Sequence, residues 1–88
     1  MTIWKYSLQI TDRQTVTMPA GAEILDVHEQ AGGLQLWAVV DPDAEREQRV
    51  IEIVGTGGLM PDGPYRRYLA TVQTGGGLLV WHVFEVVR

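Results

Sequence analysis

The feature that most constrains this chain is the regular spacing of its short apolar runs. Each run holds five to ten residues and is bounded by glycine, proline or charged residues, and the runs cover Ile3–Ile10, Ala22–Val27, Leu34–Val40, Val50–Val54, Tyr68–Val72 and Leu78–Val87. Several of them alternate apolar with polar side chains, which is the two-residue period of a strand, and none sustains a helical period. The spacing predicts a single all-β domain over residues 1–88. We expect six to seven short antiparallel strands in a compact barrel or two-layer sandwich.

Turn signals predict how the strands connect. Residues 3–10 and 14–18 flank Thr-Asp-Arg, whose short polar side chains favour a turn, so these two strands are expected to pair as a hairpin. Residues 22–30 and 34–41 flank Ala-Gly-Gly, and adjacent glycines suit the positive φ values of a tight hairpin turn. The second hairpin is the best supported pairing in the chain. The strand over 34–41 is apolar on both faces after its first residues and is expected to lie in the centre of a sheet.

The remaining connections are read from charge and glycine content. Asp41-Pro42 fits the start of a turn or a single helical turn, and the charged continuation Arg46–Arg49 is expected to be solvated. Gly55–Pro64 holds four glycines and two prolines in ten residues, which predicts the long loop of the domain. The triplet Gly75–Gly77 predicts a turn into the last strand.

Composition removes several classes of protein. The chain has no cysteine, so it has no disulfide framework. Its net charge of −4 disfavours a general nucleic-acid binder, which needs clustered lysine and arginine. No apolar run approaches the roughly 20 residues of a membrane-spanning helix. Because a strand pattern begins at Ile3 with no basic or apolar leader before it, we expect a cytoplasmic protein without membrane association.

Residues that could carry acid-base or metal chemistry are scattered. The titratable candidates are His28, His82, Asp26, Glu52 and Glu85, and none lies in a recognisable motif. His82 stands in an apolar strand and fits a structural histidine bonded to a neighbour. We therefore predict no catalytic residue, no metal site and no cofactor, and the chain is not expected to be an enzyme.

One segment has the composition of a ligand site. Backbone N–H groups can converge on an anion where glycine leaves room, guanidinium groups pair with phosphate, and aromatic rings stack on bases. The candidate ligand-binding residues are Gly55, Thr56, Gly57, Tyr65, Arg66, Arg67 and Trp37.

Each element of this candidate site also has a structural interpretation. The glycine run can be a flexible turn, and the arginines can pair with the acidic stretch Asp41–Glu47 at the surface. Trp37 can belong to a core or an interface. If the segment is a strand, Arg66 and Arg67 point to opposite faces, so one pocket receives at most one of them from a single subunit.

Six short motifs resemble a family of small uncharacterised proteins encoded by bacteriophages and prophages. They are Ile3-Trp4-Lys5-Tyr6, Met18-Pro19-Ala20-Gly21-Ala22, Leu36-Trp37-Ala38, Val40-Asp41-Pro42, Gly55-Thr56-Gly57 and Trp81-His82-Val83-Phe84-Glu85. The resemblance covers nearly the whole chain and implies an origin without an activity. Small phage proteins are often stoichiometric inhibitors, and one class sequesters nucleotide-derived signals of bacterial immunity as homo-oligomers.

Two functions follow as expectations. The first is a non-enzymatic phage protein in the cytoplasm of the bacterial host that binds a small anionic, nucleotide-like ligand and sequesters an immune signal. The alternative is a protein-binding module that inhibits a host protein or serves phage assembly. Both predict a homo-oligomer, because a domain this small has a thin core.

Overall fold

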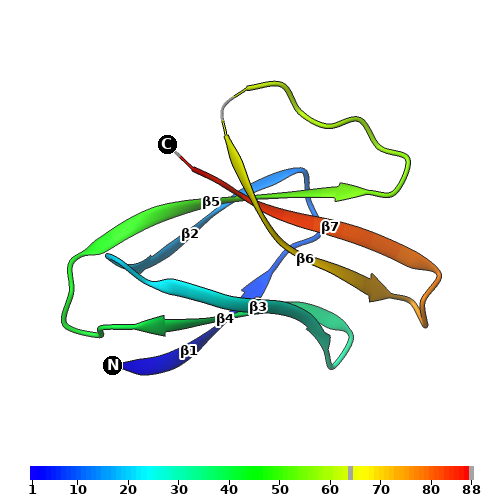
Figure 1. The fold of residues 1–88 in the computed structure, drawn as a ribbon. Coiled ribbons are helices and arrows are strands. Elements are labelled where there is room, and N and C mark those ends of the chain that lie inside the picture. The colour runs from blue at the N-terminus through cyan, green and yellow to red at the C-terminus, as the bar shows by residue number, and fades with distance from the viewer. Residues whose placement is uncertain (64, 88) are drawn as a thin grey trace.

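The computed structural model describes residues 1–63 and 65–87. Within these residues the chain forms seven strands and no helix (Figure 1). The strands are β1 (Thr2–Leu8), β2 (Arg13–Pro19), β3 (Glu23–Gln30), β4 (Gly33–Val40), β5 (Arg46–Gly55), β6 (Arg66–Thr74) and β7 (Leu79–Val86). The described part of the chain holds no helix that is long and apolar enough to cross a membrane.

The strands form two antiparallel sheets that face each other. One sheet has the order β1-β4-β3 and the other the order β2-β5-β7-β6. The sheets are not closed into a barrel, so of the two predicted architectures the sandwich is confirmed. Apolar residues that alternate along both sheets meet between them, as the two-residue period requires.

The core is built mainly from the middle strands. In β4 the residues that face inward are completely or almost completely buried, and β5 and β7 contribute Ile51, Ile53 and Val83 from the opposite sheet. β4 lies in the centre of its sheet, as predicted. Its second face, with Trp37 and Val39, is only half-buried because no further layer of the described chain covers it.

The predicted hairpin between β1 and β2 is wrong. β1 pairs with β4, whereas β2 pairs with β5 in the other sheet. The side chain of Gln14 explains the separation: its Nε2 donates to the carbonyl of Gln9 at 2.7 Å, and its Oε1 accepts from the N–H of Gln9 at 3.0 Å. This amide occupies the backbone groups that a paired strand would use, so the chain turns a corner into the second sheet.

The charged segment Arg46–Arg49 forms the first part of β5, and its first three residues are exposed, as predicted. Its cross-strand partners are Thr17 and neighbouring residues of β2. Arg49 points inward and is half-buried against Glu85, which the charge pattern did not indicate. The predicted turn before this segment is confirmed: the Asp41 carboxylate accepts from the N–H of Asp43 at 3.0 Å.

The β3–β4 hairpin is confirmed, with Gln30 opposite Gly33. Its two turn residues are Ala31 and Gly32, both at positive φ (53° and 84°), rather than the pair of glycines. In β3 an extra residue at Leu25 shifts the register between Ile24 and Asp26, so Ile24 and Val27 face the same side of the sheet.

The two predicted glycine-rich connections are found as turns and loops. Gly75–Gly77 form the β6–β7 turn, all at positive φ. The residues after Gly55 form the long connection that arches over the top of the molecule in Figure 1. Pro64 of this predicted loop lies outside the described residues.

Candidate functional site

Arg66 and Arg67 lie on opposite faces of the four-stranded sheet, as their adjacency in a strand predicts. Arg66 Nε donates to Glu52 Oε1 at 2.6 Å on the outer face. Arg67 Nη2 donates to Glu85 Oε1 at 2.6 Å on the inner face. Their ion-pair partners are thus buried glutamates of β5 and β7, and the predicted pairing with Asp41–Glu47 is wrong.

Glu85 is the centre of an ionic cluster between the sheets. The residue is 2% exposed, and its carboxylate accepts from Arg49 through both oxygens and from Arg67 through Oε1. Arg49 also donates to the Ala22 carbonyl at 2.8 Å, which ties the cluster to the start of β3. Burial by itself would raise the pKa of Glu85, but the hydrogen bonds and charges of Arg49 and Arg67 outweigh it and hold that pKa below its ordinary value. The hydrogen bond to Glu85 raises the pKa of Arg49 in turn.

Arg67 lines two grooves. One lies in the seam between β3 and β6, along Gly21–Asp26, and the other lies along Glu47–Val50 of β5 and Glu85–Val87. Arg67 itself is paired with Glu85. In each groove the carboxylates equal or outnumber the guanidiniums, so neither offers net positive charge to an anion.

The glycine turn at the end of β5 is closed on itself. Gly58 N–H donates to the Gly55 carbonyl at 2.9 Å, and Gly57 adopts a φ of 89°, which suits glycine. Thr56 N–H donates to the Val80 carbonyl at 3.2 Å. The N–H of Thr56, one of the predicted ligand residues, is thus already bonded within the chain, as is that of the neighbouring Gly58.

Both ring nitrogens of His82 are bonded to threonines, so this histidine has neighbouring partners as predicted. Nε2 lies 2.8 Å from Thr56 Oγ1, and Nδ1 lies 3.1 Å from Thr71 Oγ1. The chain of hydroxyls continues from Thr71 to Tyr68 over 2.7 Å. This row holds the glycine turn against β7 and β6 on the outer face of the sheet.

The groove beside the glycine turn has the composition of a ligand site. It measures about 760 Å³, within the usual range for small-molecule sites, and we refer to it as the β5-end groove. Its walls are mostly apolar and include one guanidinium; the lining residues are Ile10, Thr11, Asp12, Arg13, Glu52, Ile53, Val54, Gly55, Gly58, Leu59, Pro61 and Trp81.

Local structure positions the groove. The backbone N–H of Ile53 donates to the Asp12 carbonyl, which fixes the turn before β2 against the β5 edge. A Cβ on Gly55 would lie 3.2 Å from the Trp81 ring, so glycine there lets the indole pack against the strand. A Cβ on Gly58 would lie 3.0 Å from the Gly55 carbonyl, so this position also requires glycine.

Arg13 is the cation of this groove. Its Nη1 lies 3.5 Å from Glu52 Oε2, and its side chain is 53% exposed. Glu52 is shared with Arg66, which holds it more closely. An arginine has five N–H donors, so a single long ion pair leaves Arg13 able to receive a phosphate or carboxylate.

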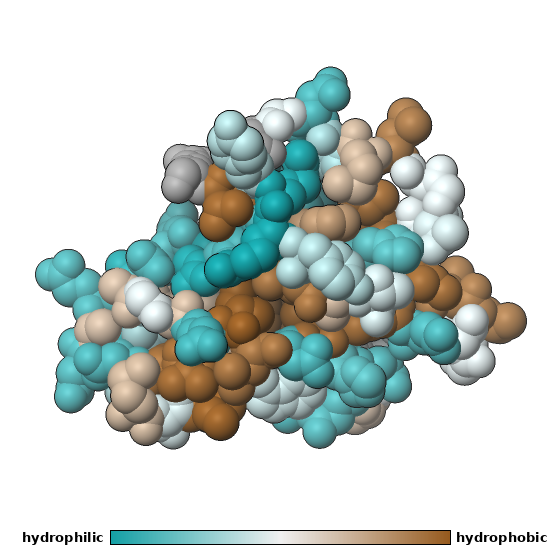
Figure 2. Space-filling model, in the orientation of Figure 1, coloured by the Kyte–Doolittle hydropathy of each residue, from teal (hydrophilic) through white to brown (hydrophobic). Residues whose placement is uncertain are grey.

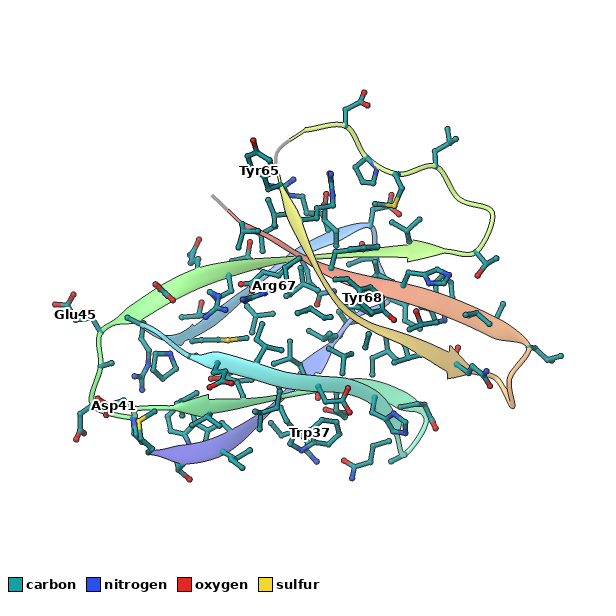
Figure 3. All side chains as sticks on the ribbon, in the orientation of Figure 1. Trp37, Asp41, Glu45, Tyr65, Arg67 and Tyr68 are labelled. Atoms are coloured by element: carbon teal, nitrogen blue, oxygen red, sulfur yellow. The ribbon has the colours of Figure 1, made fainter. Side chains whose placement is uncertain are left out.

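The seven predicted ligand residues do not meet at one groove. Gly55 lines the β5-end groove, and Thr56 and Gly57 belong to its turn, but Arg66 and Arg67 do not line it. Figure 3 shows Tyr65 above the start of β6, Arg67 near the centre of the molecule, and Trp37 on the opposite side below β4. Tyr65 is 84% exposed.

Sequence reasoning missed Arg13 as a candidate. It was assigned to a turn, whereas it is the first residue of β2 and the pairing of β2 with β5 places it opposite Glu52. A basic residue next to a predicted turn was the only available signal, and such a signal is common. In the described residues no group of three or more His, Asp or Glu side chains is arranged to hold a metal ion.

A family model described as Domain of unknown function (DUF7352) matches residues 1–88. This confirms that the family is an uncharacterised one. Comparisons with curated proteins and with solved structures found no significant match.

Proposed function

The chain belongs to the DUF7352 family of unknown function, and we propose that it is a non-enzymatic protein that binds a small anionic, nucleotide-like ligand in the β5-end groove. The observation that supports this most is the juxtaposition of a half-exposed guanidinium with apolar walls and an indole. Arg13 supplies the charge, and Trp81 and Leu59 supply apolar surface beside the glycine turn.

This combination favours a ligand with one charged end and one flat apolar end. A guanidinium pairs bidentately with phosphate, and an aromatic side chain stacks on a base. A free inorganic anion would contact only Arg13 and leave the apolar walls of the groove exposed to water. A neutral apolar molecule would leave Arg13 unused. A nucleotide satisfies both ends.

We propose further that the protein is phage-encoded and sequesters a nucleotide-derived signal of bacterial immunity in the cytoplasm of the host. The motifs that resemble phage and prophage proteins support this origin. A chain of 88 residues that binds its ligand stoichiometrically needs no catalytic set to remove it from circulation.

Calorimetric titration with cyclic nucleotides and ADP-ribose derivatives tests the ligand. We expect at least one member of this panel to bind, and Arg13→Gln to weaken its affinity about ten- to a hundredfold, as expected for loss of a charged hydrogen bond.

Arg67→Gln is the matched control, because Arg67 is 55% exposed and is likewise paired with a buried glutamate. It should leave the affinity unchanged. Loss of binding in Arg67→Gln but not in Arg13→Gln would place the ligand in the β3–β6 seam and reject the β5-end groove. No binding across the whole panel would reject a nucleotide ligand.

The second candidate function is a protein-binding module that inhibits a host protein or serves phage assembly. It is favoured by the rim of the same groove, where Leu59 is 93% exposed and Met60 is 52% exposed. In that case Leu59→Ser would abolish recovery of one stoichiometric partner from host lysate. Arg13→Gln would then have the smaller effect.

A further inference from the structure

The outer face of the three-stranded sheet carries an apolar centre with opposite charges on its two sides. The registers define two rows across the strands: Ile3, Val39 and Glu23 in one, and Lys5, Trp37 and Asp26 in the next. Directly opposed residues of neighbouring strands project on the same side of a sheet. Leu36 and Ala38, which flank Trp37, are fully buried, so both rows face away from the core.

This face is open in the described chain. Ile3 is 57% exposed, and Trp37 and Val39 are half-buried on a central strand. Figure 3 shows Trp37 projecting away from the four-stranded sheet, and Figure 2 shows hydrophobic surface at the lower left, where the three-stranded sheet lies. Burial of a tryptophan and two aliphatic side chains is the usual centre of a protein interface.

The charges beside this centre are not neutralised by each other. Lys5 Nζ donates to the neutral amide of Gln30 at 3.0 Å, and the Asp26 carboxylate accepts from the backbone N–H of Val27. Across the described residues neither side chain forms an ion pair. Lys5 projects from β1 at one edge and the two acids from β3 at the other edge, and the bond to Gln30 of β3 is one that Lys5 would exchange for a carboxylate.

We propose that this face is an isologous dimer interface whose occupant is a second copy of this chain. A two-fold axis parallel to β4 would place β1 of each copy over β3 of the other and leave β4 over β4. Because such an axis keeps the position along the strand, Lys5 of one copy would lie opposite Asp26 of the other. The two Trp37 side chains would meet between these two ion pairs. The surface is thus complementary to itself: the apolar centre of one copy meets that of the other, and each lysine meets an acid.

This proposal is independent of the ligand, since the β5-end groove lies at the end of β5 in the other sheet. Failure of nucleotide binding would leave the dimer untouched. Loss of the dimer would likewise leave the groove intact.

Two charge reversals, Lys5→Glu and Asp26→Lys, test the interface both separately and as a mixture. In a dimer of Lys5→Glu, each new glutamate would face Asp26, and in a dimer of Asp26→Lys, each new lysine would face Lys5. We expect both variants to raise the dimer dissociation constant at least about tenfold in sedimentation equilibrium. An equimolar mixture of the two should form heterodimers with wild-type affinity, because every lysine then faces an acid. Recovery in the mixture also shows that both variants are folded.

Glu45→Lys provides the control. It makes the same kind of charge change on an exposed side chain that projects from the β4–β5 turn, away from this face (Figure 3). It should leave the dissociation constant unchanged. A wild-type chain that stays monomeric at high micromolar concentration would overturn the proposal. So would a wild-type dimer that the two reversals leave intact, or a mixture that stays monomeric.

Discussion

Glu52 and Glu85 are buried on opposite faces of one sheet, and each carboxylate binds one half-buried and one exposed arginine. Glu52 holds Arg66 and Arg13, and Glu85 holds Arg49 and Arg67. The opposite directions of Arg66 and Arg67 could be predicted from the strand period. Their ion-pair partners could not be predicted, because Glu52 and Glu85 lie 14 and 18 residues away in the sequence and only strand pairing brings them near.

We expect Glu85→Gln to lower the free energy of unfolding by about 3 kcal/mol at neutral pH, since it removes the buried counter-charge of the half-buried Arg49 and leaves only the exposed Glu47 at 3.5 Å. The pKa of Glu85 in the folded chain lies below its ordinary value of 4.5. Its contribution is therefore present at neutral pH and is lost as the pH falls through the lowered pKa. Chemical denaturation across this acidic range measures both effects.

The exposed Glu45→Gln serves as the control and should change the free energy of unfolding by less than about 0.5 kcal/mol. Equal stability of Glu85→Gln and the wild type at pH 7 would contradict the assigned ionic cluster. A Glu85→Gln variant with the same acid dependence as the wild type would show that other carboxylates control it.

At the scale of elements, the sequence predicted the positions of the strands better than it predicted which strands pair with each other. Alternating or apolar runs located all seven strands, although the first four residues of β5 were not assigned to a strand, and the positive φ of Gly32 fits the predicted β3–β4 turn. The β1–β2 hairpin failed because a side chain competed with the backbone. A bulge at Leu25 adds a residue to β3 that no alternation pattern indicates. β6 has a similar irregularity at Leu69, on the strand that faces β3 across the seam.

The corner between the sheets gives an element-scale prediction. Gln14→Ala removes two hydrogen bonds to Gln9 and should lower the free energy of unfolding by about 1 to 2 kcal/mol. Because the lost bonds include the Gln9 amide, its hydrogen exchange should accelerate while the centre of β4 stays protected. Gln48→Ala, an exposed glutamine on β5, should be close to neutral. Equal exchange at Gln9 in the wild type and Gln14→Ala would show that the corner does not depend on this amide.

At the scale of the whole molecule, two open sheets leave two kinds of surface. One is the β5-end groove, where the corner turn, the glycine turn and Trp81 meet. The other is the uncovered outer face with Trp37. Sequence reasoning identified the glycine turn and the opposed arginines. It did not assemble a site, because residues at a turn, a strand end and a loop come together only through the order β2-β5-β7.

The three tryptophans report on three separate places in this molecule. Trp81 lines the β5-end groove, and Trp37 lies on the outer face of the other sheet. Trp4 faces inward with the Arg46 guanidinium 5.5 Å from its ring centre. Each indole N–H gives its own signal in a nitrogen–proton correlation spectrum, so one titration reads all three.

The most direct test of the proposed site is therefore a titration of the labelled protein, at constant protein concentration, with the tightest-binding nucleotide of the panel. The groove predicts that the indole signal of Trp81 moves in proportion to occupancy while those of Trp4 and Trp37 stay in place. A saturable shift of Trp37 with Trp81 unmoved, or binding that moves none of the three, would contradict it.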